Sequence, residues 1–153
     1  MRFAKLAAAL LLAFCALAGP AFAEVAVVDV ARVIERSVPG KVGQQYIDNL
    51  RKSLNDELAA FAKSASKDKD AAQKTAQKQA ELNARFNAEY SRVSGLMAEE
   101  VRKAVAGWLK ANKEGVTVVV PAGSALGFKP DADVSREILK RLNRVKIDFA
   151  KKK

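Results

Sequence analysis

The feature that most constrains the fold is a long segment without helix-breaking residues. Between Gly43 and Gly95 the sequence contains neither glycine nor proline, and its residues are mainly ones that favour helix. Pro39 suits the first turn of a helix and Gly115 suits its end, so we expect a helical region over 41–114. One straight helix of that length would measure about 110 Å at about 1.5 Å per residue, far more than a small domain. We therefore expect it to fold back on itself as a hairpin.

Large apolar residues recur every three or four positions in both halves of this helical region. This spacing places each set along one side of a helix, where only a partner helix can bury it. No large apolar residue occurs between Phe61 and Leu82, so the turn is expected within about 62–81. The outgoing set is Ile47, Leu50, Leu54, Leu58 and Phe61, and the returning set is Leu82, Phe86, Tyr90, Val93, Met97, Val101, Val105 and Trp108.

Two valine-rich runs flank the hairpin, EVAVVDV at 24–30 and GVTVVV at 115–120. Their composition and length are typical of buried strands. The following PAGSALGF contains turn residues and a short apolar piece for which we consider a third strand. A last helix is expected to start near Ser135 with Glu137 in its first turn, and the basic tail KIDFAKKK is expected to fray. The residues expected to pack this helix on the sheet are Ile138, Leu139, Leu142 and Val145.

These elements predict an α+β fold in two parts. Residues 24–40 and 115–153 would form a small body of strands and a C-terminal helix, and 41–114 a projecting, antiparallel, coiled-coil-like helical hairpin. Two or three strands with one short helix bury little apolar surface. We therefore expect an oligomer. Trp108 is interpreted as an anchor between arm and body. The candidate residues of the body and oligomer core are Val25, Val27, Val118, Val120 and Trp108.

The N-terminal residues have the pattern of a secretory signal peptide. Arg2 and Lys5 precede an apolar run at 6–19, and Ala21-Phe22-Ala23 has the small-x-small pattern of a cleavage site. We therefore expect 1–23 to be removed and the mature chain to reach the periplasm. The apolar run is shorter than the roughly 20 residues of a membrane-spanning helix.

The charge of the chain narrows the partners that it would bind. The net charge is +10, and without Arg2 and Lys5 the mature chain has 25 basic and 17 acidic residues, or +8. This favours anionic partners, namely lipopolysaccharide, acidic lipid or acidic polypeptide, whereas export argues against nucleic acid. Five lysines crowd the expected tip, where they would contact a client or anionic lipid, or serve solubility alone. They are Lys63, Lys67, Lys69, Lys74 and Lys78.

The sequence offers little for catalysis or metal binding. There is no histidine, and the only cysteine, Cys15, lies in the expected signal peptide. No phosphate-binding GxxxxGK[ST] loop is present. The acidic pairs Asp68 with Asp70 and Asp131 with Asp133 lack the remaining ligands of a calcium loop and are interpreted as solvated charges. We expect no enzyme activity, cofactor or metal.

The two ends of the mature chain resemble a known family. VAVVDVARVIERSVPGK at 25–41 resembles the opening strand, short helix and turn of the Skp/OmpH-like periplasmic chaperones, and GVTVVVPAGSALGFKPDADVSREILKRLN at 115–143 resembles their closing strand, loop and helix. The resemblance covers essentially the whole mature chain. It implies a homotrimer with a shared β-core, whose three arms enclose a cavity that holds unfolded outer-membrane proteins without ATP.

Two functional hypotheses remain open. The first is an ATP-independent holdase that prevents aggregation of outer-membrane proteins in transit. The second is a structural or adaptor coiled coil of the cell envelope that binds one folded partner. A holdase binds many unfolded barrels and ignores folded ones, whereas an adaptor has a single partner and a defined contact stripe.

Overall fold

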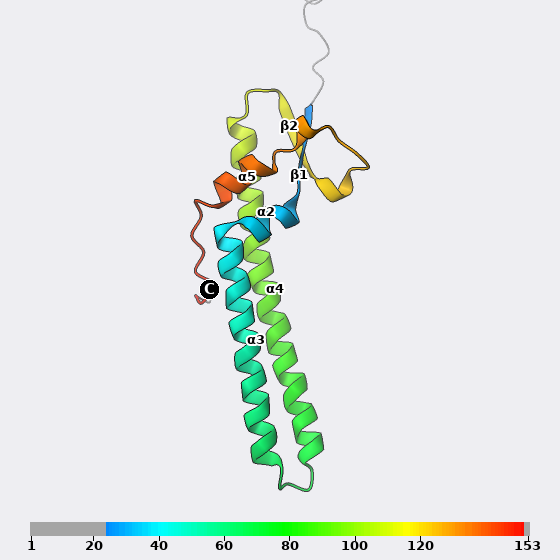
Figure 1. Ribbon diagram of the computed structural model, residues 1–153, viewed down its shortest axis with the longest axis vertical. Coiled ribbons are helices and arrows are strands. Elements are labelled where there is room, and N and C mark those ends of the chain that lie inside the picture. Colours follow the sequence, from blue (N-terminus) through cyan, green and yellow to red (C-terminus); the bar gives the residue numbers. More distant parts are fainter. Residues whose placement is uncertain (1–23, 152–153) are drawn as a thin grey trace, which may run out of the picture.

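The computed structural model describes residues 24–151, so the expected signal peptide lies outside the described residues. A small body carries two long antiparallel helices that project from it side by side (Figure 1). Helix α3 spans Val38–Ala65 and helix α4 spans Ala71–Ala111. At about 1.5 Å per residue their 28 and 41 residues give lengths of about 42 and 61 Å. The chain turns between them at 66–70.

The two helices bury the apolar stripes that the sequence places on them. Ile47 and Leu54 of α3 and Leu82, Val93 and Met97 of α4 are all buried. Polar contacts also join the helices, because Glu57 pairs with Lys78 at 2.9 Å and with Arg85 at 3.5 Å. Arg51 lies over the Phe86 ring, 5.0 Å from its centroid. The hairpin is thus held by its apolar seam and by charged groups beside it.

A buried serine starts α3. Ser37 is fully buried, and its hydroxyl accepts a hydrogen bond from the Gly40 amide at 2.9 Å and donates one to the Ile34 carbonyl at 2.8 Å. Pro39 occupies the first turn, where a missing amide hydrogen costs nothing. Ser37 therefore joins α3 to the preceding helix α2, Val30–Arg36.

The body contains a two-stranded parallel sheet. Strand β1, Glu24–Val28, pairs with β2, Val116–Pro121. The inner face, with Ala26, Val28 and Val119, packs on the core that α4 and helix α5 (Ser135–Leu142) complete. Ile138 and Leu142 of α5 are fully buried, while Leu139 and Val145 are half-buried against the same core. The strands are thus joined to the hairpin base and to α5 through one hydrophobic core.

Two expectations about the body were wrong. The segment after β2 forms no third strand; it contains short 3-10 turns at Ala122–Ser124 and Pro130–Ala132 and a loop between them. The free edge of β1 is instead taken by the chain before α5, where the Val134 amide donates to the Val27 carbonyl at 2.9 Å. Strand β2 is half exposed in the single chain, so its expected burial by other subunits stays a prediction. The tail at 146–149 is packed on the protein and not frayed, because Phe149 is only 3% exposed.

The end of α4 also differs from expectation. The helix ends at Ala111, before Gly115, and Asn112 is its C-cap. Gly115 has φ +83°, a conformation that glycine adopts without strain, and it lies in the loop that leads into β2. Glycine here turns the chain into the strand, whereas the asparagine ends the helix.

Candidate functional site

The hairpin tip divides the five candidate lysines into two groups. The ammonium of Lys78 pairs with Glu57 at 2.9 Å and Glu81 at 3.2 Å, and its side chain is only 19% exposed. Lys74 pairs with Asp68 at 2.6 Å. These two lysines therefore hold the hairpin together near its turn. The other three are exposed and form no ion pair within residues 24–151; they are Lys63, Lys67 and Lys69, the tip trio.

The ion pairs at the tip also shift protonation. The Lys78 ammonium lowers the pKa of Glu57, and the carboxylates of Glu57 and Glu81 raise the pKa of Lys78. Glu57 and Lys78 consequently stay charged over a wider pH range than isolated side chains would. The tip trio is the part of the lysine cluster that is available to a partner.

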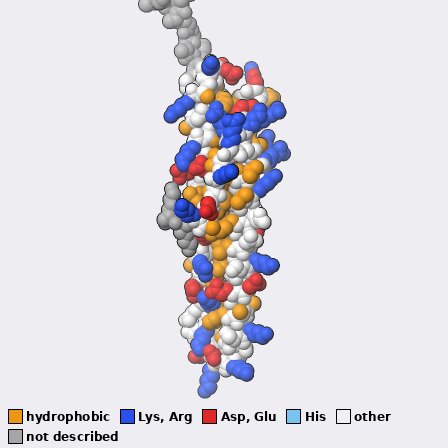
Figure 2. Space-filling view, turned by 90° about the vertical axis from the view of Figure 1, so that its left-hand side faces the viewer, with side chains coloured by type: hydrophobic (Ala, Val, Ile, Leu, Met, Phe, Trp, Pro, Cys, Tyr) orange, Lys and Arg blue, Asp and Glu red, His pale blue; other side chains and the backbone are white. Residues whose placement is uncertain are grey.

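Two shallow grooves follow one side of the hairpin. The distal groove, about 280 Å³, has an apolar floor that includes Leu54, Leu58 and Leu82. The groove nearer the body, about 230 Å³, includes Ile47 and Met97. Figure 2 shows hydrophobic side chains as a broken strip along the hairpin, with basic and acidic side chains on both sides of it. Such a surface offers modest, distributed apolar contact rather than one deep pocket.

The outer face of the sheet is a second apolar surface. Alternation along paired strands places Val25, Val27, Val118 and Val120 together on the face opposite the chain's own core. Val25 is 51% and Val118 45% exposed, whereas Val27 is only 3% exposed and its backbone pairs with the segment before α5. The neighbouring loop adds further exposed apolar surface at Leu126 and Phe128. The four valines predicted for an oligomer core thus share one face.

Trp108, the fifth residue of that predicted set, lies elsewhere. Its side chain is half-buried near the end of α4 and packs against the hydrophobic core of the body. Its carbonyl accepts the Asn112 amide at 2.9 Å, within the end of the helix. It contributes to the junction between α4 and the body and not to the outer face of the sheet.

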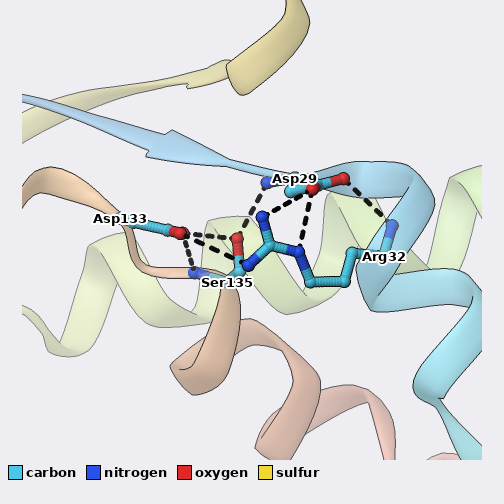
Figure 3. Close-up of polar contacts among 4 residues, drawn as sticks. All are labelled: Asp29, Arg32, Asp133 and Ser135. Atoms are coloured by element: carbon cyan, nitrogen blue, oxygen red, sulfur yellow. Dashed lines mark hydrogen bonds and ion pairs between the residues drawn. The ribbon is translucent and has the colours of Figure 1, made fainter. Parts of the chain in front are cut away.

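A polar network joins the two chain ends in the body (Figure 3). The Ser135 hydroxyl accepts a hydrogen bond from the Asp29 amide at 2.8 Å and donates one to the Asp133 carboxylate. Arg32 pairs with Asp29 at 2.8 Å and approaches Asp133 to 3.9 Å. The Arg32 backbone amide, which donates to the Asp29 carboxylate, lowers the pKa of that residue. The network fixes the start of α2 on the start of α5.

Sequence reasoning missed this network. Asp133 was interpreted as a solvated turn charge, yet it accepts hydrogen bonds from the Ser135 amide and hydroxyl. The Asp133-x-Ser135 spacing at the start of a helix was a usable signal, since acidic side chains commonly bond to amides there. Ser135 also bonds to Asp29, which lies 106 residues away in the sequence, and no local sequence pattern predicts a contact over that separation.

The described residues contain no group of three or more acidic, histidine or cysteine side chains placed to hold a metal ion. Among them there is also no helix of sufficient length and hydropathy to cross a membrane.

The sequence matches no protein-family model and no curated protein. The fold is similar to that of a crystal structure of a candidate outer membrane chaperone (OmpH-like) from Caulobacter crescentus CB15. The TM-score is 0.60 at 16% sequence identity, over 85% of this chain and 92% of that chain. At this identity the similarity concerns the fold, and on that ground this chain has an OmpH-like fold.

Proposed function

We propose that this protein is a periplasmic holdase chaperone, which binds unfolded outer-membrane proteins and prevents their aggregation without ATP. The observation that carries the proposal is the hairpin: two helices with shallow apolar grooves and interspersed charges project from a small body. Its OmpH-like fold supports the same function, since the similar crystal structure is described as a candidate outer membrane chaperone (OmpH-like).

The grooves suit a chaperone that must release its client unaided. Binding through several weak contacts can compete with aggregation, because linked contacts raise the overall affinity. Each contact remains weak enough to break singly. Over 41–114 the hairpin has 14 basic and 10 acidic residues, a net charge of +4, which attracts acidic polypeptide. The tip trio adds exposed positive charge for a client, anionic lipid or lipopolysaccharide.

We further propose that the protein assembles through the outer face of its sheet, as a trimer. Val25 and Val118 are too exposed to contribute to the core of a single chain, and they continue the apolar surface of Val120. Three bodies joined in this way would place their hairpins around a shared space. The net charge of three hairpins would then act on one client.

The test is aggregation suppression. An outer-membrane barrel protein unfolded in urea is diluted into buffer with and without the mature chain, and light scattering is followed. We expect suppression for several unrelated barrels and no binding to the same barrels once folded in detergent. Binding of one folded protein, without suppression, would favour the envelope adaptor instead and contradict the proposal.

A further inference from the structure

The last residues of the chain lie on the hairpin. After α5 the chain runs without regular secondary structure beside α3 (Figure 1), and residues 144–150 are here called the tail strap. The Asn143 side chain accepts the Val38 amide at 2.8 Å and fixes the beginning of this path. Val145 and Ile147 are half-buried against the body core, and Phe149 is 3% exposed.

Phe149 occupies a site formed by both helices, here called the Phe149 seat. Gly43 of α3 leaves room for the ring, because a Cβ at this position would lie 3.1 Å from Phe149 Cζ. The Tyr46 ring stacks on it, with centroids 6.3 Å apart and planes at 30°. Ile47 and Val93 belong to the same buried cluster as the ring. The close approach at Gly43 and the stacked ring make this a shaped site.

The polar side of the seat is organised by a chain of hydrogen bonds. The Tyr46 hydroxyl donates to Glu89 at 2.6 Å, and Glu89 pairs with Arg92 at 2.6 Å. Arg92 in turn donates to the backbone carbonyl of Phe149. Hydrogen bonding with Glu89 raises the pKa of both Tyr46 and Arg92. The ion pair with Glu89 orients the Arg92 guanidinium toward the Phe149 carbonyl.

The features of the strap that the seat contacts are ones that other unfolded polypeptides also present. At this site the strap contributes one aromatic side chain and one backbone carbonyl, and the Ala150 amide bonds only to Asp148 of the strap itself. Neither feature requires the particular sequence of the tail. We propose that the Phe149 seat is a binding site for an aromatic residue of an extended polypeptide, and that the tail strap is its resident, exchangeable ligand. The identification of unfolded clients as its competitors rests on the proposed function.

The first test uses the tail in trans. A fluorescent peptide of residues 143–151 is titrated by anisotropy against the mature chain and its Phe149→Ala variant. Because a tethered ligand acts at an effective concentration in the millimolar range, wild type should bind the peptide at least about 10-fold more weakly than the variant. Phe61→Ala, the same substitution on α3 away from the seat, should behave as wild type. A peptide with alanine in place of its phenylalanine should not bind. Equal affinities for wild type and Phe149→Ala, with the variant folded by circular dichroism, would overturn the proposal.

The second test does not depend on the folding of that variant. Lys151→Cys, in a mature chain without other cysteines, carries a fluorophore on an exposed tail residue. Excess unlabelled peptide should release the strap and lower the anisotropy of the label, whereas the alanine peptide should leave it unchanged. An anisotropy that does not respond to the peptide would refute exchange.

A third experiment tests whether unfolded clients compete for the seat. A urea-unfolded barrel protein added to the labelled chain should lower the anisotropy as the peptide does. The two peptide experiments contain no barrel protein. If they fail, the Phe149 seat is refuted as a binding site, while the aggregation assay still tests the proposed function. If the peptide releases the strap but the barrel protein does not, the seat is supported as a binding site and unfolded clients are refuted as its ligands.

Discussion

Val118→Asp tests assembly with little effect on the single chain. Fully burying a valine contributes about 1.5–3 kcal/mol, so covering the 45% of Val118 that is exposed would contribute about 1 kcal/mol per subunit. An unpaired carboxylate buried in its place costs several kcal/mol, and three copies would meet in a trimer. In the single chain the same exposed substitution should change the free energy of unfolding by at most about 0.5 kcal/mol.

Two further variants make the comparison specific. Val42→Asp introduces the same charge at a valine that is 47% exposed on α3, so it should keep the oligomeric mass of wild type. Val27→Asp replaces a side chain that is 3% exposed, so it should lower the melting temperature whatever the oligomeric state. The assay is sedimentation equilibrium at low micromolar concentration, with circular dichroism to follow folding. A Val118→Asp protein with unchanged oligomeric mass would refute assembly through this face, as would a wild type that is a stable monomer.

Three other predictions concern the hairpin. Ser37→Ala removes the hydroxyl that caps Gly40 and should lower the free energy of unfolding by about 1–2 kcal/mol in urea titrations, a result that an unchanged midpoint and slope would contradict. Reversing the tip trio to glutamate should slow capture of a urea-diluted barrel in stopped-flow at low salt but not at high salt, with unchanged circular dichroism; equal low-salt rates would leave these lysines a solubilising role. Because Lys78 lowers the pKa of Glu57 below its usual 4.5, their pairing stabilises the hairpin above that pH and is lost as the pH falls through the lowered folded-state pKa. Hydrogen exchange near the tip should accelerate in acid, and Glu57→Gln should show a smaller acid dependence; identical profiles would exclude this pair.

Hydrophobic periodicity accounts for most of what the sequence predicted. A stripe such as Leu82 to Val101 on a helix needs an apolar partner, and the polar gap after Phe61 leaves room for a turn, so the long helices follow from the sequence. The third strand did not form although Leu126 and Phe128 supply apolar character, because the segment folds as 3-10 turns and a loop. The outer edge of β1 pairs instead with the segment before α5.

The Phe149 seat could not be predicted in this way. One aromatic residue in a basic tail has no periodicity, and its site includes a glycine on α3 and an arginine on α4 that are far apart in the sequence. From the sequence, Gly43 is only a residue that disfavours helix. The structure shows that the Phe149 ring packs against Gly43, where a side chain would leave too little room. Lys78 differs from the exposed tip trio through its ion pairs with Glu81, three positions along α4, and with Glu57 on α3. No local pattern identifies Glu57 as a partner.

The parallel pairing of β1 and β2 has a consequence for the order in which the chain can fold. Parallel neighbours require a crossover connection, and here that connection includes the entire hairpin, since Val25 pairs with Val118. Closing so long a loop in a disordered chain carries a large entropic cost, which grows with the logarithm of loop length. Once α3 and α4 have packed against each other, the two strand segments lie at the same end of the hairpin. The sheet, and with it any surface for a second copy, is therefore expected to form after the arms, so that subunits meet with their hairpins already built.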